Sequence, residues 1–350
     1  MANFLNLGNA RFISDLRNDI FVDKSMLIKQ VNNNYGKSSK KFMCVTRPRR
    51  FGKTMALSML RAYYSKGCDS KELFKNLKIY NDSSFLEHLN KHNVFTIDMA
   101  GVGTSLQNKK EILNEITKSL ISDLNEAYPN ILTDENTISK ALSKIYSATK
   151  ETFIFLIDEW DYIYREFDND LELCNAYTDF LRSLFKNSAT LSCIDLVYMT
   201  GILPIKRYNS QSSLNNFTEY NMLDPYTLTE FVGFTEEEVS SLCKQYDMDI
   251  NDMKHWYDGY HYDEVGDLYN PKSVVEALTT GEYGDYWVST SSIEAVTSYM
   301  NYDNGELKDI ITLLIAGNKV DVNVSRFRND LTAVDNKDAA LTVLIHLGYL

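Results

Sequence analysis

The sequence lacks any apolar segment long enough to cross a membrane. A membrane-spanning helix needs about 20 consecutive apolar residues, and the apolar run Phe153–Ile157 is far shorter than that. The N-terminus, MANFLNLGNARFISDL, lacks the basic segment and the continuous apolar stretch of an export signal. We therefore expect neither membrane insertion nor export, and no membrane partner.

Cysteine and proline are scarce, with five of each in 350 residues. The cysteines are scattered without a CxxC pair, which argues against the disulfide framework of small secreted proteins and favours a reducing, cytoplasmic location. The five histidines share no zinc-binding spacing with these cysteines. The sequence therefore predicts no disulfide scaffold and no zinc site.

Positive charge is in deficit, because 36 basic residues face 48 acidic ones and the net charge is -12. Such a chain repels nucleic acid on average, so nucleic-acid binding would need a local basic groove. The remaining composition, 44% hydrophobic and 24% charged, is typical of a globular protein. The length suggests two domains, or one large domain with additions.

Short apolar, β-prone runs alternate with helical segments in the first part of the chain. The runs are FMCVT, VFTIDM, FIFLID and IDLVYMT, at residues 42–46, 94–99, 153–158 and 194–200. Apolar residues at helical spacing mark Glu111–Glu126 and Leu171–Lys186 between them. This alternation predicts an α/β fold with a parallel sheet flanked by helices.

The pattern changes at about residue 220 to short helices with few candidate strands. Helices are predicted in TEEEVSSLCKQ, PKSVVEALT, SSIEAVTSYM and ELKDIITLLIAG, at residues 235–245, 271–279, 291–300 and 306–317. We predict a first domain at residues 1–220 and a mainly helical second domain at 221–350, with the boundary between Leu214 and Gly233. In WYDGYHY, Asp258 and Gly259 predict a tight hairpin.

The segment RPRRFGKT follows the first apolar run and precedes a helical pattern. Strand, loop and helix in this order are the context of a phosphate-binding loop, in which main-chain N–H groups at a helix N-terminus bind phosphate oxygens. Gly52 allows close approach, Lys53 reaches the β- and γ-phosphates, and Thr54 offers a hydroxyl to Mg²⁺. Arg49, Arg50 and Phe51 complete the predicted ATP-binding loop.

One position departs from the pattern GxxxxGK[ST], because its first glycine falls on Arg47. Pro48 restricts the loop further. Arg47, Arg49 and Arg50 offer charge-assisted contacts to phosphate or to a partner. The alternative is a solvated basic turn before a helix, and the surrounding pattern favours the phosphate-binding loop.

The third apolar run ends in the acidic pair Asp158 and Glu159. Asp158 is predicted to hold Mg²⁺, and Glu159 to orient or deprotonate the attacking water. This arrangement is compatible with a Walker B strand beside the strand that precedes the phosphate-binding loop. A buried strand that ends in a solvated acidic turn is the alternative.

Other polar residues near these strand ends are weaker candidates. Thr200, at the end of the fourth run, is placed to sense the γ-phosphate, or it simply ends a strand. Asp161 is interpreted as a helix cap or a salt-bridge partner. Lys206 and Arg207 are interpreted as a surface charge pair, with an arginine-finger role as the alternative.

Taken in order, these segments resemble a bacterial and archaeal AAA-ATPase-like family whose members often carry a PD-(D/E)XK-type nuclease domain after the ATPase. The resemblance rests on FISDLRNDIFVDKSMLI, TRPRRFGKT, FLIDEWD, TGILPI, SSLNNF, FVGFTEEEV, WYDGYHY and LYNPKSVV. In this family an arginine-rich loop replaces the first glycine, which accounts for Arg47.

The resemblance implies a P-loop ATPase domain and a helical, winged-helix-like region. It also leads us to expect a longer chain that continues past HLGYL towards a nuclease. No D…(D/E)xK arrangement follows the predicted boundary, so we assign no nuclease activity to these residues. Asp23 and Lys24, within the family-like FVDKS, are candidates for closing the nucleotide site.

The predicted function is a Mg²⁺-dependent ATPase, or a slow nucleotide switch that controls an attached effector domain. The alternative is a nucleic-acid-binding module with a vestigial nucleotide site, in which the second domain or a missing nuclease domain contacts nucleic acid. The sequence leaves oligomerisation open.

Overall fold

A five-stranded parallel sheet forms the centre of the protein, in the order β2-β3-β4-β1-β5. The computed structural model describes residues 3–133, 135–205, 214–287, 306–324 and 337–350. The strands are β1 (Phe42–Thr46), β2 (Asn93–Asp98), β3 (Phe153–Asp158), β4 (Ile194–Gly201) and β5 (Thr218–Tyr220). The parallel α/β fold predicted from the sequence is confirmed, and β5 is an additional strand.

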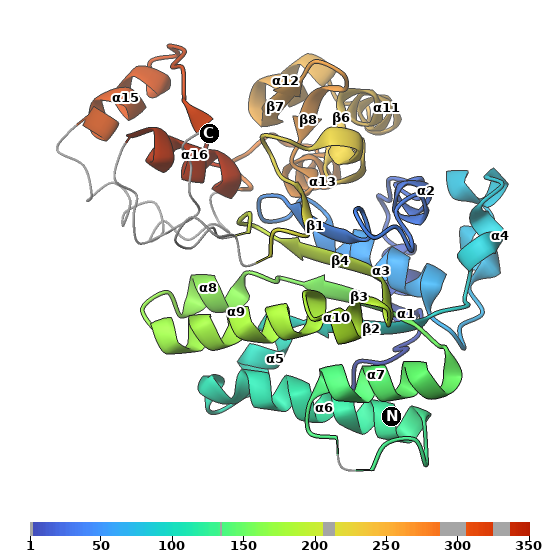
Figure 1. Ribbon diagram of the computed structural model, residues 1–350. Helices are drawn as coiled ribbons and strands as arrows, with labels where there is room; N and C mark the ends of the chain where they lie inside the picture. Colours follow the sequence, from blue (N-terminus) through green and yellow to red (C-terminus); the bar gives the residue numbers. More distant parts are fainter. Residues whose placement is uncertain (1–2, 134, 206–213, 288–305, 325–336) are drawn as a thin grey trace.

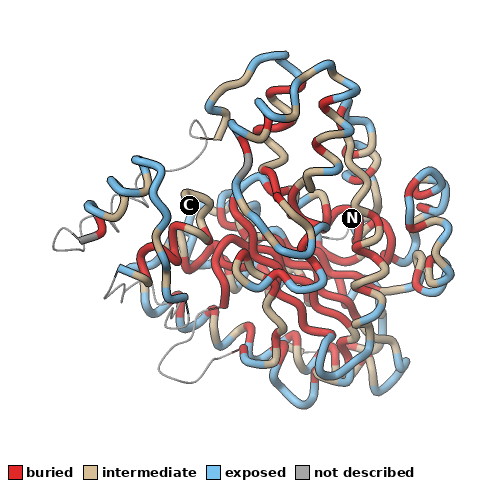
Figure 2. The backbone as a smooth tube through the Cα atoms, turned by 90° about the horizontal axis from the view of Figure 1, so that it is seen from above, coloured by how far each residue is buried: buried red, intermediate tan, exposed pale blue. Residues whose placement is uncertain are grey.

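Side chains along each strand alternate between two hydrophobic clusters, one on each face of the sheet. Phe153, Phe155 and Ile157 of β3 belong to one cluster, whereas Ile154 and Leu156 belong to the other. Figure 2 shows the resulting buried layer through the middle of the molecule. Because both faces are covered, each strand reads as a continuous apolar run.

Helices cover both faces of the sheet (Figure 1). One face packs against α6 (Ile112–Ala127), α7 (Ile138–Thr149) and α9 (Leu171–Phe185). The other packs against α1 (Ala10–Asp15), α2 (Leu27–Asn32) and α3 (Lys53–Tyr64). Shorter helices of the same region are α4 (Phe85–His88), α5 (Met99–Ser105), α8 (Tyr162–Glu166) and α10 (Ser188–Leu191), with 3₁₀ turns at Lys71–Phe74, Lys78–Asn81 and Lys109–Glu111.

The strand order corrects one expectation, because β4 lies between β1 and β3. The acidic strand is therefore not beside the strand that leads into the phosphate-binding loop. Since all these strands run parallel, their carboxyl ends still meet at one edge of the sheet. Thr200 at the end of β4 consequently lies between the loop and the acidic pair.

A second region combines helices with a small antiparallel sheet, β6-β8-β7. Its elements are a 3₁₀ turn (Tyr226–Phe231), β6 (Phe234–Thr235), α11 (Glu236–Tyr246), α12 (Ile250–Tyr257), β7 (Asp258–Tyr262), β8 (Gly266–Tyr269) and α13 (Pro271–Thr280). They enclose a separate hydrophobic cluster. The helical character of this region was predicted, whereas the three-stranded sheet was not.

The hairpin in this region is real, but its turn lies at residues 263–265. Asp258 and Gly259 instead begin the strand β7, where the pairing with β8 is irregular. The predicted turn position was wrong because Gly266, with φ +77°, supplies the left-handed residue that ends the turn.

The end of the chain forms α15 (Glu306–Ile315) and α16 (Lys337–Leu347). The helix predicted at 291–300 lies outside the described residues. In the described ranges, no helix is long and apolar enough to cross a membrane.

Candidate nucleotide-binding site

The loop between β1 and α3 adopts a conformation that L-amino acids rarely take. Arg50 has φ +67° and Gly52 has φ +84°. Gly52, which directly precedes α3, takes this conformation without a Cβ clash. The turn exposes the N-terminal end of a 12-residue helix, where unpaired N–H groups and the helix dipole favour an anion.

Lys53 is almost fully buried at the start of α3, with 8% of its surface exposed. Its Nζ donates to the carbonyl oxygens of Arg47, at 2.9 Å, and Pro48, at 2.7 Å. Burial lowers the pKa of Lys53 to about 8, although the carboxylates of Asp158, Asp161 and Glu159 oppose this shift. The ammonium group therefore replaces part of its lost hydration with the loop's own carbonyl groups.

The Asp158 carboxylate joins the phosphate-binding loop to the ends of β3 and β4. One oxygen, Oδ2, accepts a hydrogen bond from Thr54 Oγ1 at 2.7 Å. The other, Oδ1, accepts hydrogen bonds from the Thr200 hydroxyl and from the main-chain N–H of Glu159. Asp158 is buried, so these three donors offset much of the cost of desolvating its charge.

Glu159 has φ +51°, a strained main-chain conformation for a non-glycine residue. Its carboxylate forms an ion pair with Arg165 of α8, with Oε2 and NH2 2.7 Å apart. Arg165 also lies 3.1 Å from Asp161, measured from Nε to Oδ2. Burial opposes the charge of Arg165, but Asp161 and Glu159 outweigh it and raise the pKa of the guanidinium group.

Asp161 fixes the turn after β3 to the segment after β4. Its Oδ2 accepts hydrogen bonds from the main-chain N–H groups of Ile202, at 3.1 Å, and Leu203, at 2.9 Å. It makes no side-chain cap on α8. Of the two interpretations from the sequence, the salt bridge is therefore observed and the cap is not.

A cavity of about 830 Å³ brings these groups together. Its charged and polar lining includes Lys53, Thr54, Asp158, Glu159 and Arg165. Apolar residues also line it, namely Ile20, Phe21, Val22, Phe231, Phe234 and Val275. The cavity thus offers both charge and hydrophobic surface, from the N-terminal segment, the loop and the second region.

The arginines of the loop divide between two environments. Arg49 and Arg50 are exposed and line the cavity, as the sequence predicts for phosphate contacts. Arg47 is completely buried and donates to the carbonyl oxygens of Thr46 and Tyr220, each at 2.8 Å. It therefore lies away from the cavity and ties β1 to β5.

Asp23 and Lys24 connect the N-terminal segment to other parts of the fold. Asp23 accepts hydrogen bonds from the main-chain N–H groups of Ser25 and Lys78. Lys24, which lines the cavity, donates to Glu238 Oε2 of α11 at 2.5 Å and to the carbonyl oxygen of Glu230. The second region is thus joined to the cavity wall by a largely buried ion pair.

The oxygen donors near the loop suit Mg²⁺ better than a transition metal. Among the described residues no group of three His, Cys, Asp or Glu side chains is arranged to hold a metal ion. Mg²⁺ bound with phosphates needs only one or two protein oxygens, and Thr54 and Asp158 provide two that lie 2.7 Å apart. These residues fit the predicted magnesium site.

The structure brings together the site residues predicted from the sequence, from Arg49 to Thr54 and at Asp158, Glu159 and Thr200. Lys206 and Arg207 lie outside the described residues. Sequence reasoning missed Arg165 and the start of α13, where Pro271 and Lys272 reach the cavity. The sequence NPKS carries a signal for that helix start, an N-cap Asn270 followed by proline, but nothing local to α8 identifies Arg165.

Solved structures similar to this chain include three proteins at low sequence identity. PCH-2 of C. elegans is 12% identical with a TM-score of 0.32, covering 96% of this chain and 71% of that one. Cdc6p from Pyrobaculum aerophilum is 12% identical with a TM-score of 0.31, covering 92% and 79%. The Aeropyrum pernix ORC2 protein, in ADPNP–ADP complexes, is 11% identical with a TM-score of 0.33, covering 97% and 85%. At these TM-scores, the fold assignment rests on the strand order described above.

No curated protein matches the sequence significantly. The family described as predicted AAA-ATPase matches residues 11–209, which is more than half of the chain and includes the loop, the acidic pair and Thr200. Membership of this family implies nucleotide binding. The chain therefore belongs to the predicted AAA-ATPase family.

Proposed function

We propose that this protein binds ATP with Mg²⁺ in the large cavity and hydrolyses it, either as an ATPase or as a slow switch for an attached effector domain. One observation carries the proposal: Asp158 accepts hydrogen bonds from both Thr54 and Thr200, in a cavity that Lys53 also lines. A phosphate-binding helix start, a magnesium ligand and a polar strand end thus converge on one space.

In the proposed complex the triphosphate lies against the N-terminus of α3. Lys53 exchanges its hydrogen bonds to the carbonyl groups of Arg47 and Pro48 for contacts with phosphate oxygens. Because the ammonium group is buried, its attraction to the charged phosphate is strong and offsets the lost hydrogen bonds. Arg49 and Arg50 add positive charge from the exposed side of the loop. The base is proposed to lie against apolar lining residues such as Ile20 and Phe231, which are buried.

Thr54 and Asp158 are the proposed ligands of Mg²⁺. When bound, the ion neutralises charge on the β- and γ-phosphates. Thr200 holds Asp158 through its hydroxyl, so we assign Thr200 a positioning role. Direct contact of Thr200 with the γ-phosphate would require this hydroxyl to turn away from Asp158.

Glu159 is the proposed group that orients or deprotonates the attacking water. Its side chain is 41% exposed on the cavity side and is held by Arg165, which is itself anchored to Asp161. Arg165 thereby fixes the direction of the Glu159 carboxylate. The strained main chain at Glu159 must be held in place by its surroundings. We assign the ion pair with Arg165 to this support and therefore to the catalytic arrangement.

The binding half of the proposal is tested by calorimetry with ATP, with and without Mg²⁺. Lys53→Ala is expected to weaken ATP binding at least about 100-fold, a loss of about 2.7 kcal/mol. Lys118→Ala is the matched control, because Lys118 is exposed on α6 at the far face of the sheet. Equal ATP binding by the Lys53 variant and the wild type would refute the proposal.

The hydrolytic half is tested by phosphate release. Glu159→Gln is expected to bind ATP normally and to lower turnover about 100-fold or more, whereas the exposed control Glu126→Gln keeps wild-type turnover. If neither Lys53→Ala nor Glu159→Gln changes turnover, the activity belongs to another protein. Salt-sensitive DNA binding without any ATP-dependent thermal shift would instead favour a nucleic-acid-binding module with a vestigial site.

A further inference from the structure

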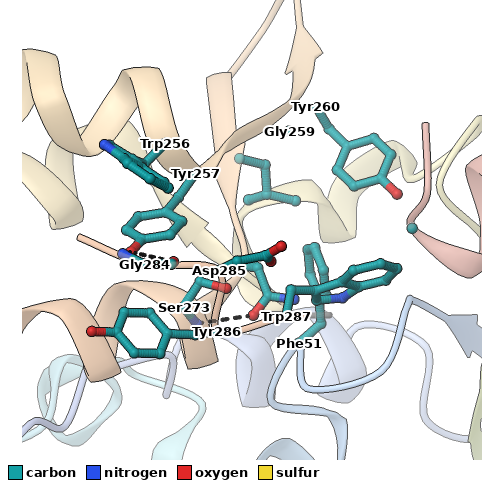
Figure 3. A pocket seen from close by; sticks show the side chains of 13 residues that line it. Phe51, Trp256, Tyr257, Gly259, Tyr260, Ser273, Gly284, Asp285, Tyr286 and Trp287 are labelled. Carbon is teal, nitrogen blue, oxygen red and sulfur yellow. Dashed lines mark hydrogen bonds between the residues drawn. The ribbon is translucent and has the colours of Figure 1, made fainter. Parts of the chain in front are cut away.

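A second cavity, of about 390 Å³, shares one lining residue, Phe51, with the nucleotide cavity. Its walls come from α12, the β7–β8 hairpin, the first turn of α13 and the segment 284–287 (Figure 3). Six aromatic side chains line it: Phe51, Trp256, Tyr257, Tyr260, Tyr286 and Trp287. Neither the sequence patterns nor the proposed ATP chemistry accounts for this cavity.

The tyrosine hydroxyl groups of the second cavity are engaged by the protein itself. Tyr257 donates to the carbonyl oxygen of Gly284 and accepts from its N–H, both at 2.9 Å. Tyr260 donates to the carbonyl oxygen of Ile345 at 2.9 Å, and Tyr286 to the carbonyl oxygen four residues before it, at 3.0 Å. These bonds hold the three tyrosine rings in place.

The lining of the second cavity includes one acidic side chain. Asp285 is the one charged side chain among the described residues that line it, and no lysine, arginine or histidine is among them. Aromatic ring faces also carry negative electrostatic potential. Figure 3 shows Asp285 between the pair Trp256 and Tyr257 on one side and Trp287 on the other.

We propose that the second cavity binds an organic cation, an alkylammonium or guanidinium group, between these aromatic rings with Asp285 as its counter-ion. Ring faces attract such cations electrostatically, and more strongly where water is excluded. The volume suits one small molecule or one basic side chain. Trp256 is 51% exposed and Asp285 is also exposed, so part of the lining is accessible to solvent.

The proposal does not depend on ATP binding, because its test needs no nucleotide. The probes are choline and 3,3-dimethylbutan-1-ol, which have nearly the same shape but differ in charge. The chain has three tryptophans, and two of them, Trp256 and Trp287, line the cavity. Trp160 is buried in the core and is not among the lining residues of either cavity, so a ligand-dependent change in tryptophan fluorescence reports on the second cavity.

Choline is expected to change the fluorescence saturably and to bind at least about tenfold more tightly than its neutral analogue, a difference of about 1.4 kcal/mol. Asp285→Asn is expected to weaken choline binding about fivefold or more and to leave the neutral analogue unaffected. Asp252→Asn, an exposed carboxylate change on α12 outside the cavity lining, is the matched control. Thermal unfolding of each variant without ligand confirms that it is folded.

A third probe distinguishes a free cation from a basic side chain of a peptide. A pentapeptide with trimethyllysine at its centre, N-acetylated and C-amidated, should bind more tightly than choline if the natural ligand is a side chain, and less tightly if it is a free small molecule. Either order supports the cation site. Equal affinity for choline and its neutral analogue, no saturable signal, or equal weakening by Asp285→Asn and Asp252→Asn would overturn it.

Discussion

The two cavities that share Phe51 in their lining present different kinds of groups to a ligand. The nucleotide cavity contains buried ionic side chains that are already engaged: Lys53 with loop carbonyl groups, Asp158 with two hydroxyl groups, and Glu159 with Arg165. The second cavity holds one carboxylate among rings whose hydroxyl groups are used elsewhere. The first therefore suits a polyanion bound through metal and donors, and the second a single soft cation.

The largest effect is expected when one charge is removed from each cavity in turn. Each change should weaken the binding of one ligand and leave the binding of the other unchanged. Lys53→Ala is expected to lower ATP affinity at least about 100-fold while choline affinity stays within about twofold of wild type. Asp285→Asn is expected to lower choline affinity about fivefold or more while ATP affinity stays within about twofold of wild type. Titrating both variants with both ligands by calorimetry and fluorescence checks this, and parallel loss of both affinities in either variant would mean that the cavities are one site.

A glycine in each region offers a comparison of packing. A Cβ at Gly201 would lie 2.5 Å from Trp160 Cδ1 and 2.8 Å from Asp161 Oδ1. Gly201→Ala is therefore expected to destabilise the protein by about 1–3 kcal/mol. At Gly284 the nearest atom, Tyr286 Cζ, is 3.3 Å away, so Gly284→Ala should cost about 0.5 kcal/mol or less. Urea unfolding measures both, and equal values would contradict the difference in packing.

Removing the partner of Glu159 should affect hydrolysis more than binding. Arg165→Gln is expected to lower kcat about tenfold, or about 1.4 kcal/mol, because Glu159 loses the ion pair that orients it. The Kd for ATP should change by less than about threefold. Arg165→Lys should recover part of kcat, since it restores charge but not the paired geometry. An unchanged kcat would remove Arg165 from the positioning role.

ATP affinity should fall as the pH rises above 8. Lys53 has a pKa of about 8 in the nucleotide-free protein, and bound phosphate favours its charged form. Binding therefore requires proton uptake above that pH, and the affinity should decline by up to about tenfold per pH unit. Lys53→Arg keeps its charge and should show a flat profile between pH 8 and 9. Calorimetry in two buffers measures the proton uptake.

The same pKa carries a prediction for stability. In the unfolded chain Lys53 returns to its ordinary pKa of 10.5. Between about pH 8 and this value the folded protein binds fewer protons than the unfolded one, so this group's contribution to stability rises with pH over that window.

Substituting Phe51 should change the ligand affinities least, because its side chain lines both cavities without a charge or a hydrogen bond to offer. Phe51→Leu keeps most of the buried volume and is expected to change both affinities by about two- to threefold. An effect confined to one ligand would show that the ring serves only one cavity.

The sequence predicted the sheet well because its strands are buried on both faces and read as uninterrupted apolar runs. It missed β5, since the three residues Thr218–Tyr220 form no pattern of their own. The order of the strands was also beyond reach, because pairing depends on contacts between distant segments. For this reason the sequence did not reveal that β4 lies between β1 and β3.

The candidate site divides in the same way. Lys53, Thr54 and Asp158 were predictable because each occupies a fixed position in a strand-loop-helix or strand-end motif. Arg165 was not, since a lone arginine on a short helix acquires its role only when α8 turns it towards Glu159. The second cavity combines five segments of the chain, so no local pattern could reveal it.

The predicted phosphate-binding loop should not tolerate Arg47→Gly, although this change would restore the first glycine of the pattern GxxxxGK[ST]. The Arg47 guanidinium group is fully buried, two of its nitrogens find no hydrogen-bond partner among the described residues, and burial lowers its pKa. The side chain has become part of the core, where it connects β1 to β5. Replacing it by glycine would leave a void under the loop and remove the link between β1 and β5, so Arg47 acts through packing and main-chain hydrogen bonds.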